Sequence, residues 1–308
     1  MRITTFLLAA CLATPALAAP GALPPPLLLT DAFTASWETT KDQPPAARVA
    51  DFRSRVAARF PAFYRNKGDG ADADSEQRIL RALDNFPAIR AGYERKAAEF
   101  TAMLDTHLAT FRARFPDYRP NHEIVVLHSL GEMDGGVRTL DGKPYLIFGV
   151  DVMARREGSE AAFFHHELFH TYHLPYLGRC EGGIWMPLWA EGLATHVAKT
   201  MNPQASDTEL LLDVPAGTVA RTKASLDSAL EQLARNLDSE DATLAASLFT
   251  TRGADGALPV RRGYYLGYLV AQQAGRHHGL EQLAQLDCAQ VRALIGTALD
   301  ELRQARRP

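Results

Sequence analysis

The segment His166-Glu167-Leu168-Phe169-His170 constrains this chain more than any other. In an α-helix, residues four apart lie on the same face, one turn from each other, so the two imidazoles can share one metal ion if this segment is helical. Glu167 stands between them, where its carboxylate can take a proton from a water molecule. The pattern therefore predicts a helix that binds Zn²⁺ through His166 and His170.

The residues around this motif predict where its helix begins and ends. Ser159 is a suitable N-cap, and Glu160 in the first turn interacts favourably with the helix dipole. Pro175 should end the helix, because the residue before a proline avoids the helical conformation. We therefore expect a helix from about Glu160 to His173, in strongly apolar surroundings.

Glu191 is the expected third metal ligand. A second helix should begin at Pro187 and continue toward Pro203, because proline is favoured in the first turn of a helix. Twenty residues separate His170 from Glu191, and glycines among them let the chain turn back beside the first helix. Three protein ligands and one open position are typical of a catalytic zinc site rather than a structural one.

This arrangement resembles the gluzincin superfamily, the thermolysin-like and aminopeptidase-like zinc peptidases. In that superfamily the third ligand is a glutamate roughly twenty residues after the second histidine, as Glu191 is. The segment 191–194, Glu-Gly-Leu-Ala, is similar to the Glu-Gly-Phe-Ala of the aminopeptidase branch. The resemblance implies a zincin-like fold and a peptide or protein substrate. The metzincin pattern is excluded, because it needs Gly and His where this chain has His173 and Tyr176.

A second similarity to the aminopeptidase branch lies at residues 263–268, Gly-Tyr-Tyr-Leu-Gly-Tyr. There, a tyrosine three residues before the second glycine donates a hydrogen bond to the oxyanion that forms during the reaction. Tyr264 occupies this place, and Tyr265 and Tyr268 are the alternatives. A phenol directed at a developing negative charge is an expected form of electrostatic stabilisation.

The chain also departs from the family pattern. Ala190 stands where an asparagine often precedes the third ligand, and Thr195 stands where thermolysin-like enzymes have an aspartate that orients a zinc histidine. The nearest counterpart of the amine-binding Gly-x-Met-Glu-Asn strand is 131–135, a poor match. The groups that support the metal ligands should therefore differ from those of the family.

The rest of the chain predicts an α+β fold that is mostly helical. Residues 31–118 have mainly helical patterns, with two helices, 75–86 and 88–115, on either side of Pro87. Strands are expected at the three segments Glu123–His128, Val137–Leu140 and Pro144–Val150. Asp141-Gly142 joins the last two as a hairpin, which indicates a small antiparallel sheet before the zinc helix.

The segment Tyr145–Asp151 is our candidate for an edge strand that pairs with an extended substrate, and a purely structural hairpin is the alternative. Helical patterns resume after Ser206. We expect three regions: a signal peptide at 1–18, an N-terminal helical region at 19–118, and a zincin-like metallopeptidase region at 119–308 with a C-terminal helical lobe.

The N-terminus predicts export to the periplasm or the exterior. Arg2 is followed by an apolar stretch and by Ala16-Leu17-Ala18, a suitable cleavage site. Lipid attachment at Cys11 is the alternative. No later apolar run is long enough to span a membrane. An oxidising compartment favours a disulfide between Cys180 and Cys288, and two separate thiols are the alternative.

The charge balance argues against a nucleic-acid partner. The chain has 33 Lys and Arg against 36 Asp and Glu, with a net charge of −3, and no basic stripe. The sequence therefore predicts a zinc-dependent peptidase, with Glu167 as general base and Tyr264 beside the oxyanion. Two alternatives stay open: a zinc-containing envelope interaction protein without catalytic activity, and a zinc amidase that acts on cell-wall peptides.

Overall fold

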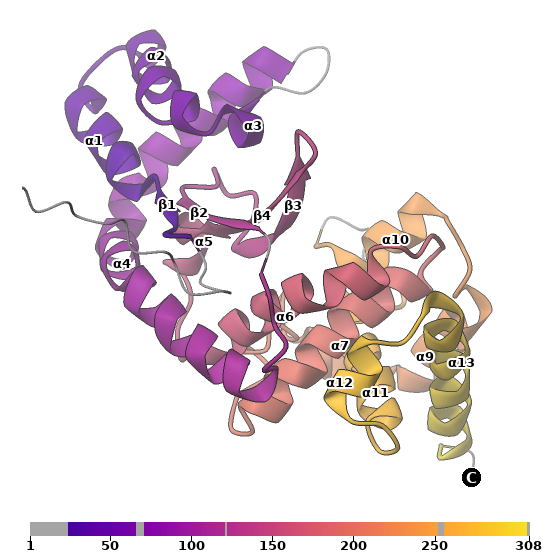
Figure 1. Cartoon of the computed structure of the whole chain (residues 1–308). Coiled ribbons are helices and arrows are strands. Elements are labelled where there is room, and N and C mark those ends of the chain that lie inside the picture. The colour runs from indigo at the N-terminus through magenta and orange to yellow at the C-terminus, as the bar shows by residue number, and fades with distance from the viewer. Residues whose placement is uncertain (1–23, 66–70, 121, 252–255, 307–308) are drawn as a thin grey trace, which may run out of the picture.

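The computed structural model describes residues 24–65, 71–120, 122–251 and 256–306 (Figure 1). It is mostly helical and contains a four-stranded sheet, which confirms the α+β class. The predicted signal peptide and Cys11 lie outside the described residues. In the part of the chain that the structure describes, no helix is both long enough and apolar enough to cross a membrane.

The sheet is mixed, so the prediction of an antiparallel sheet was wrong. Its strands are β1 (Leu27–Leu28), β2 (Glu123–Leu127), β3 (Gly135–Leu140) and β4 (Lys143–Gly149), in the order β1-β2-β4-β3. β1 pairs parallel with β2, and β2 pairs parallel with β4. Only the β3–β4 pair is antiparallel. The local hairpin was visible in the sequence, whereas the parallel pairings join segments that are distant in it.

The hairpin turn is the one that the sequence predicted. Asp141 and Gly142 have φ angles of 49° and 77°, as a two-residue turn with left-handed conformations requires. The edge-strand assignment, however, was wrong. Residues 145–149 belong to β4, which has β2 on one side and β3 on the other, and residues 150–151 begin helix α5. β4 is an apolar run buried on both faces, as a central strand must be, and β3 is the edge strand.

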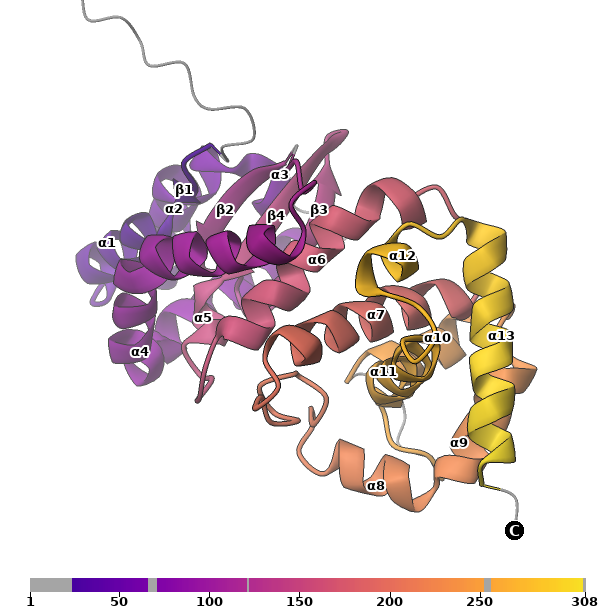
Figure 2. The ribbon, with the colours of Figure 1, turned by 60° about the horizontal axis from the view of Figure 1, so that its bottom comes forward.

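The N-terminal helices flank the sheet on both faces (Figures 1 and 2). They are α1 (Thr30–Thr40), α2 (Pro45–Arg55), the short 3₁₀ helix η1 (Ala57–Arg59), α3 (Pro61–Tyr64) and α4 (Ala71–Arg114). Phe60, next to α3, packs on Tyr145 of β4, whereas Phe100 of α4 packs on Phe148 from the opposite face.

The two helices expected around Pro87 are one helix, α4, of 44 residues. Buried Phe86, Ile89 and Tyr93 flank this proline, and their packing outweighs the backbone hydrogen bond that Pro87 removes.

Helix α6 lies between the sheet and the C-terminal helices (Figures 1 and 2). The elements that follow the sheet are α5 (Val150–Met153), α6 (Ala161–Leu177), α7 (Trp185–Met201), α8 (Thr218–Ala224), α9 (Leu226–Arg235), α10 (Ala242–Phe249), α11 (Arg262–Ala274), α12 (Leu280–Ala284) and α13 (Cys288–Gln304). α6 continues through Pro175 to Leu177, so its expected end at His173 was wrong. The residue before a proline disfavours the helical conformation without excluding it.

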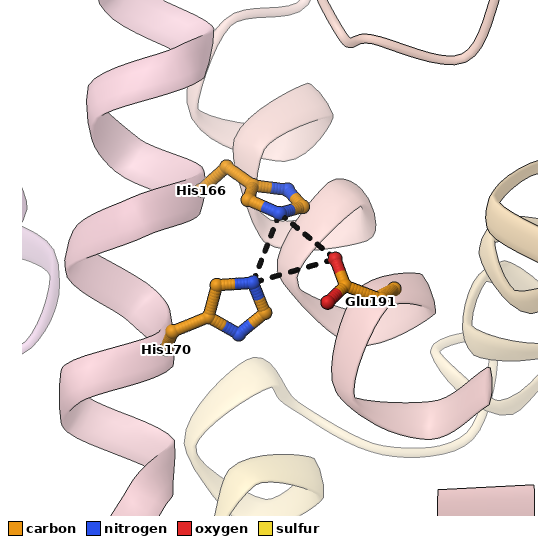
Figure 3. Close-up of side chains that lie close together, drawn as sticks. All are labelled: His166, His170 and Glu191. Carbon is orange, nitrogen blue, oxygen red and sulfur yellow. Dashed lines mark hydrogen bonds and ion pairs between the residues drawn. The ribbon is translucent and has the colours of Figure 1, made fainter. Parts of the chain in front are cut away.

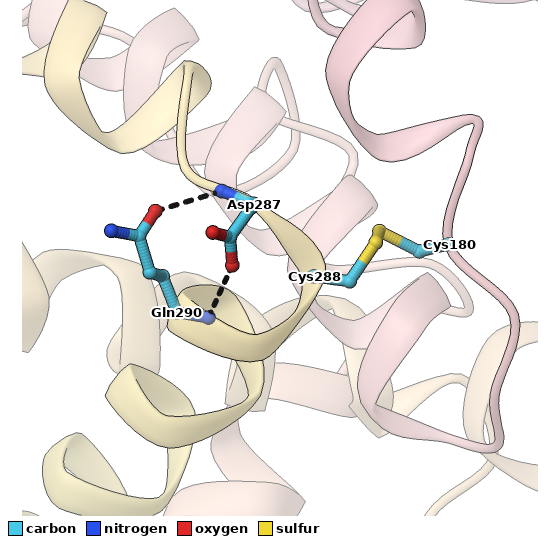
Figure 4. The surroundings of a disulfide bond; sticks show 4 residues. All are labelled: Cys180, Asp287, Cys288 and Gln290. Atoms are coloured by element: carbon cyan, nitrogen blue, oxygen red, sulfur yellow. Dashed lines mark hydrogen bonds between the residues drawn. A yellow bond between two sulfur atoms is a disulfide. The ribbon is translucent and has the colours of Figure 1, made fainter.

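A disulfide holds the C-terminal helices against the loop after α6. Cys180 in that loop is bonded to Cys288, the first residue of α13, across a sequence separation of 108 (Figure 4). Asp287 and Gln290 form a capping box at the same helix end. The predicted bridge is confirmed, and it closes a long loop that contains α7 to α12.

Helices α7 and α11 touch through their backbones at two glycines. A Cβ atom on Gly192 would lie 2.3 Å from the backbone carbon and oxygen of Gly267. A Cβ on Gly267 would lie 2.4 Å from the carbonyl oxygen of Leu188. Only glycine permits this distance, and the contact brings the first turn of α11 beside Glu191.

We predict that Gly192→Ala lowers the free energy of unfolding by about 1–3 kcal/mol, because the methyl group must push the two helices apart. Gly296→Ala in α13 is the matched control, since its Cβ would meet only the Arg292 Nη1 atom, at 3.8 Å. The control should be neutral or more stable by about 0.5–1 kcal/mol, the usual gain from alanine inside a helix. Urea unfolding measures both, and equal effects of the two substitutions would contradict the backbone contact.

Candidate metal centre

Two helices bring three side chains to one point. His166 and His170 project from one face of α6, and Glu191 projects toward them from α7 (Figure 3). The two histidine Nε2 atoms are 3.0 Å apart. Glu191 Oε2 lies 3.2 Å from His166 Nε2 and 3.4 Å from His170 Nε2. Among the described residues, this is the group of three His, Cys, Asp or Glu side chains whose ligand atoms converge.

The spacing of these atoms fits a zinc ion. Bonds of about 2.0–2.1 Å in tetrahedral directions place neighbouring ligand atoms about 3.3–3.4 Å apart, and the three observed separations are close to this value. Two imidazoles and one carboxylate are also a usual donor set for zinc. Among the described residues no fourth His, Cys, Asp or Glu joins this group, an arrangement that would leave one zinc position for a non-protein ligand.

The charges at this point favour the ligand form of the carboxylate. Burial by itself would raise the pKa of Glu191, but His170 and His166 outweigh it and hold this pKa well below its usual range. Burial by itself would lower the pKa of His170, but the negative charge of Glu191 outweighs it and raises this pKa to about 9. Since a metal needs the neutral imidazole, binding must displace a proton from His170 at neutral pH.

Glu167 lies beside this group and is 4% exposed. Burial raises the pKa of its carboxyl group to about 8. Its Oε2 atom has no hydrogen-bond partner among the described residues, so this carboxylate holds no part of the fold in place. Gly135 makes room for it, since a Cβ at that position would lie 3.0 Å from Glu167 Cγ. A buried carboxyl group without a structural partner is suited to transferring protons.

His166, His170 and Glu191, the candidate metal ligands, line a pocket of about 450 Å³ together with Glu167. Strand β3 contributes residues 135–138, and the other walls come from α6, α7 and the segment before α11. Tyr264 also lines this pocket, and burial raises the pKa of its phenol, which keeps the hydroxyl protonated. Tyr265 and Tyr268 are not among the lining residues. Tyr265 is buried in the apolar cluster around Leu210, against which Tyr264 and Tyr268 also pack.

The neighbouring histidines and Thr195 have other contacts. His165 Nδ1 lies 2.8 Å from the side-chain nitrogen of Asn202, away from the pocket. His173 lines the pocket, and burial lowers its pKa to about 3. Thr195 donates a hydrogen bond to the carbonyl oxygen of Glu191, so it fixes the α7 backbone rather than a histidine ring.

Three charged residues of the pocket were given no role from the sequence: Asp134, Arg138 and Arg261. Asp134 accepts hydrogen bonds from Arg156, at 3.3 Å, and from the Gly135 backbone, at 3.0 Å. Arg261 lies against Tyr264, with its guanidinium carbon 3.8 Å from the ring centroid. A polar residue directly before the edge strand was the available clue for Asp134, and the position just before the tyrosine cluster was the clue for Arg261.

The chain matches no protein-family model, no curated protein and no solved structure.

We predict that the purified protein binds about one zinc ion per chain after dialysis against buffer. His170→Ala and Glu191→Gln should each weaken zinc binding by more than about 100-fold, because removal of a group that only orients a ligand already costs about 10–100-fold. His277→Ala is the matched control, since His277 is exposed and does not line the pocket. Chelator competition and elemental analysis measure the affinity and the stoichiometry. Equal affinity in all three variants would contradict this assignment.

Proposed function

We propose that this protein is an exported zinc-dependent peptidase. The observation that carries the proposal is the position of Glu167, a buried carboxyl group with no structural partner, next to the converging His166, His170 and Glu191. The pocket that holds them has an edge strand as one wall. Export is proposed from the sequence of residues 1–18, and the gluzincin resemblance of the motifs agrees with the assignment.

A Zn²⁺ ion held by His166, His170 and Glu191 would lower the pKa of a water molecule and polarise a carbonyl group. Glu167 takes the proton from water as the new C–O bond forms. It then gives the proton to the amide nitrogen as the C–N bond breaks, which releases a carboxylic acid and an amine. Its raised pKa suits both steps, because the group must gain and lose a proton near neutral pH.

Tyr264 is the proposed oxyanion donor. Burial raises the pKa of its phenol, which keeps the hydroxyl protonated, and the residue lines the same pocket as Glu167 and Glu191. Strand β3 is the proposed place where an extended substrate pairs with the main chain, because it is the sheet edge and residues 135–138 line the pocket. This replaces the earlier assignment of that role to residues 145–151.

Glu167→Gln should keep zinc and lose peptide hydrolysis by about 10²–10⁴-fold, since the amide is isosteric but cannot accept the proton. The wild type and the variant are each loaded with zinc and incubated with a mixed peptide library, and mass spectrometry identifies the cuts. Equal cleavage by the two proteins would contradict the proposal. If neither protein cleaves any peptide while each binds one zinc per chain, the alternative of a zinc-containing interaction protein without catalytic activity would be favoured. Cleavage of cell-wall peptides alone would favour the amidase.

Tyr264→Phe should lower kcat by about 10²–10³-fold with little change in KM, because a transition-state donor is lost. Tyr265→Phe is the matched control: it removes the neighbouring hydroxyl, on a residue outside the pocket. Steady-state kinetics on one library peptide compare the two. A larger loss of kcat in Tyr265→Phe than in Tyr264→Phe would contradict the assignment of this role to Tyr264.

A further inference from the structure

Arg261 places a cation in the metal pocket without an acidic partner. Its Nη1 donates a hydrogen bond to the carbonyl oxygen of Leu211, and its guanidinium carbon lies 3.8 Å from the centroid of the Tyr264 ring. Among the described residues no carboxylate lies within ion-pair distance of it, and one of its five N–H groups has a hydrogen-bond partner. The side chain is half-buried, so water compensates its charge only in part.

The acidic groups of the pocket are engaged elsewhere. Asp134 pairs with Arg156, and Glu191 contacts the two histidines. Glu167 is the remaining acid, and the proposed function uses it on the reacting water. A second guanidinium, Arg138, lines the pocket from β3; its Nη1 donates a hydrogen bond to the carbonyl oxygen of Val137, and no described carboxylate forms an ion pair with it. The part of the pocket near Arg261 is therefore complementary to an anion.

The backbone holds Arg261 in a fixed and unfavourable conformation. Its φ angle is 61°, and that of its hydrogen-bond partner Leu211 is 58°, both in the left-handed region that side chains disfavour. The Arg261 backbone N–H donates to the carbonyl oxygen of Ser247 at 2.8 Å. Non-glycine residues kept in this region are concentrated at ligand-binding sites, where strain serves to position a group. The guanidinium itself is held by its hydrogen bond to the Leu211 carbonyl oxygen and by its contact with the Tyr264 ring.

Arg261 and the candidate metal ligands line the same pocket, so an anion bound by Arg261 lies near the reacting bond. About 450 Å³ is near the lower end of the range for small-molecule sites and holds only a few amino-acid residues. A planar guanidinium with free N–H groups binds a carboxylate through two parallel hydrogen bonds. A peptide has such a group at its C-terminus, close to the last peptide bonds.

We propose that the site accepts peptides by their C-terminal carboxylate, with Arg261 as the residue that binds it, and that cleavage occurs within the last few residues. This proposal rests on the proposed peptidase function, which it deepens from a general peptidase to one that acts at C-terminal ends. An acidic side chain near the cleaved bond offers the same chemistry, and the experiment separates the two sources.

Binding is measured by calorimetry on Glu167→Gln protein, both zinc-loaded and metal-free, so that the result does not depend on hydrolysis. Three N-acetylated peptides of one sequence are compared: the free acid, the C-terminal amide, and the amide with an aspartate in the last position. Both the zinc-loaded and the metal-free protein should bind the free acid about 10- to 100-fold more tightly than the plain amide, as expected for a charge-assisted pair of hydrogen bonds.

Arg261→Gln should remove this preference, and Arg261→Lys should keep part of it. Arg95→Gln is the matched control, because Arg95 is exposed on α4 and outside the pocket. If the Glu167→Gln protein, in which Arg261 is unchanged, binds the free acid and the plain amide with equal affinity, the inference is overturned. This outcome does not depend on how well the Arg261 variants fold. If only the aspartyl amide binds more tightly than the plain amide, Arg261 binds an acidic side chain, and the assignment to the C-terminal carboxylate is overturned.

The two proposals fail in different ways. If the acid is preferred in binding while the zinc-loaded wild type cleaves nothing, the carboxylate site stands and the peptidase function fails. If the wild type cleaves acid and amide peptides equally well, internally and at the ends, the peptidase function stands and the role of Arg261 fails.

Discussion

The backbone contact between Gly192 in α7 and Gly267 in α11 sets how closely the helices that carry Glu191 and Tyr264 approach each other. Because the two helices touch without side chains between them, Glu191 and Tyr264 come to the same pocket, and α7 is left with its other face free to pack on α6. A larger residue at either glycine would move the third metal ligand or the tyrosine away from the histidines. The disulfide from Cys180 to Cys288 holds the same group of helices together from the outside.

A second constraint anchors α6 to the sheet side of the molecule. Lys96 on α4 pairs with Glu160 at the start of α6, and both are almost fully buried. Arg156 continues the network, at 3.6 Å from Glu160 and 3.3 Å from Asp134. The network thus connects the long N-terminal helix, the zinc-motif helix and the loop before β3. Loss of one partner would leave a buried charge uncompensated, so the three elements are held as one unit.

The convergence of His166, His170 and Glu191 could be predicted because its information is local. The four-residue spacing of His166 and His170 places both on one helix face. Glu191 follows about twenty residues later, after glycines that let the chain return as a second helix. The structure brings the three side chains together. The sheet order could not be predicted, since the pairing of Leu27–Leu28 with β2 joins segments almost a hundred residues apart. Pro87 and Pro175 were misjudged because tertiary packing outweighs local preference. Arg261 was missed because its position depends on Leu211, fifty residues earlier.

The central claim is that α6 and α7 form a zinc site with three protein ligands and one position open to the pocket. Zinc-edge X-ray absorption on the loaded protein tests it most directly, with Glu191→Gln measured beside the wild type. The account predicts a zinc ion of low coordination number, with two imidazole nitrogens and oxygen ligands at about 2.0–2.2 Å and no sulfur. In the variant the set of oxygen ligands should change. A shell made of four protein ligands, or one unchanged by Glu191→Gln, would contradict it.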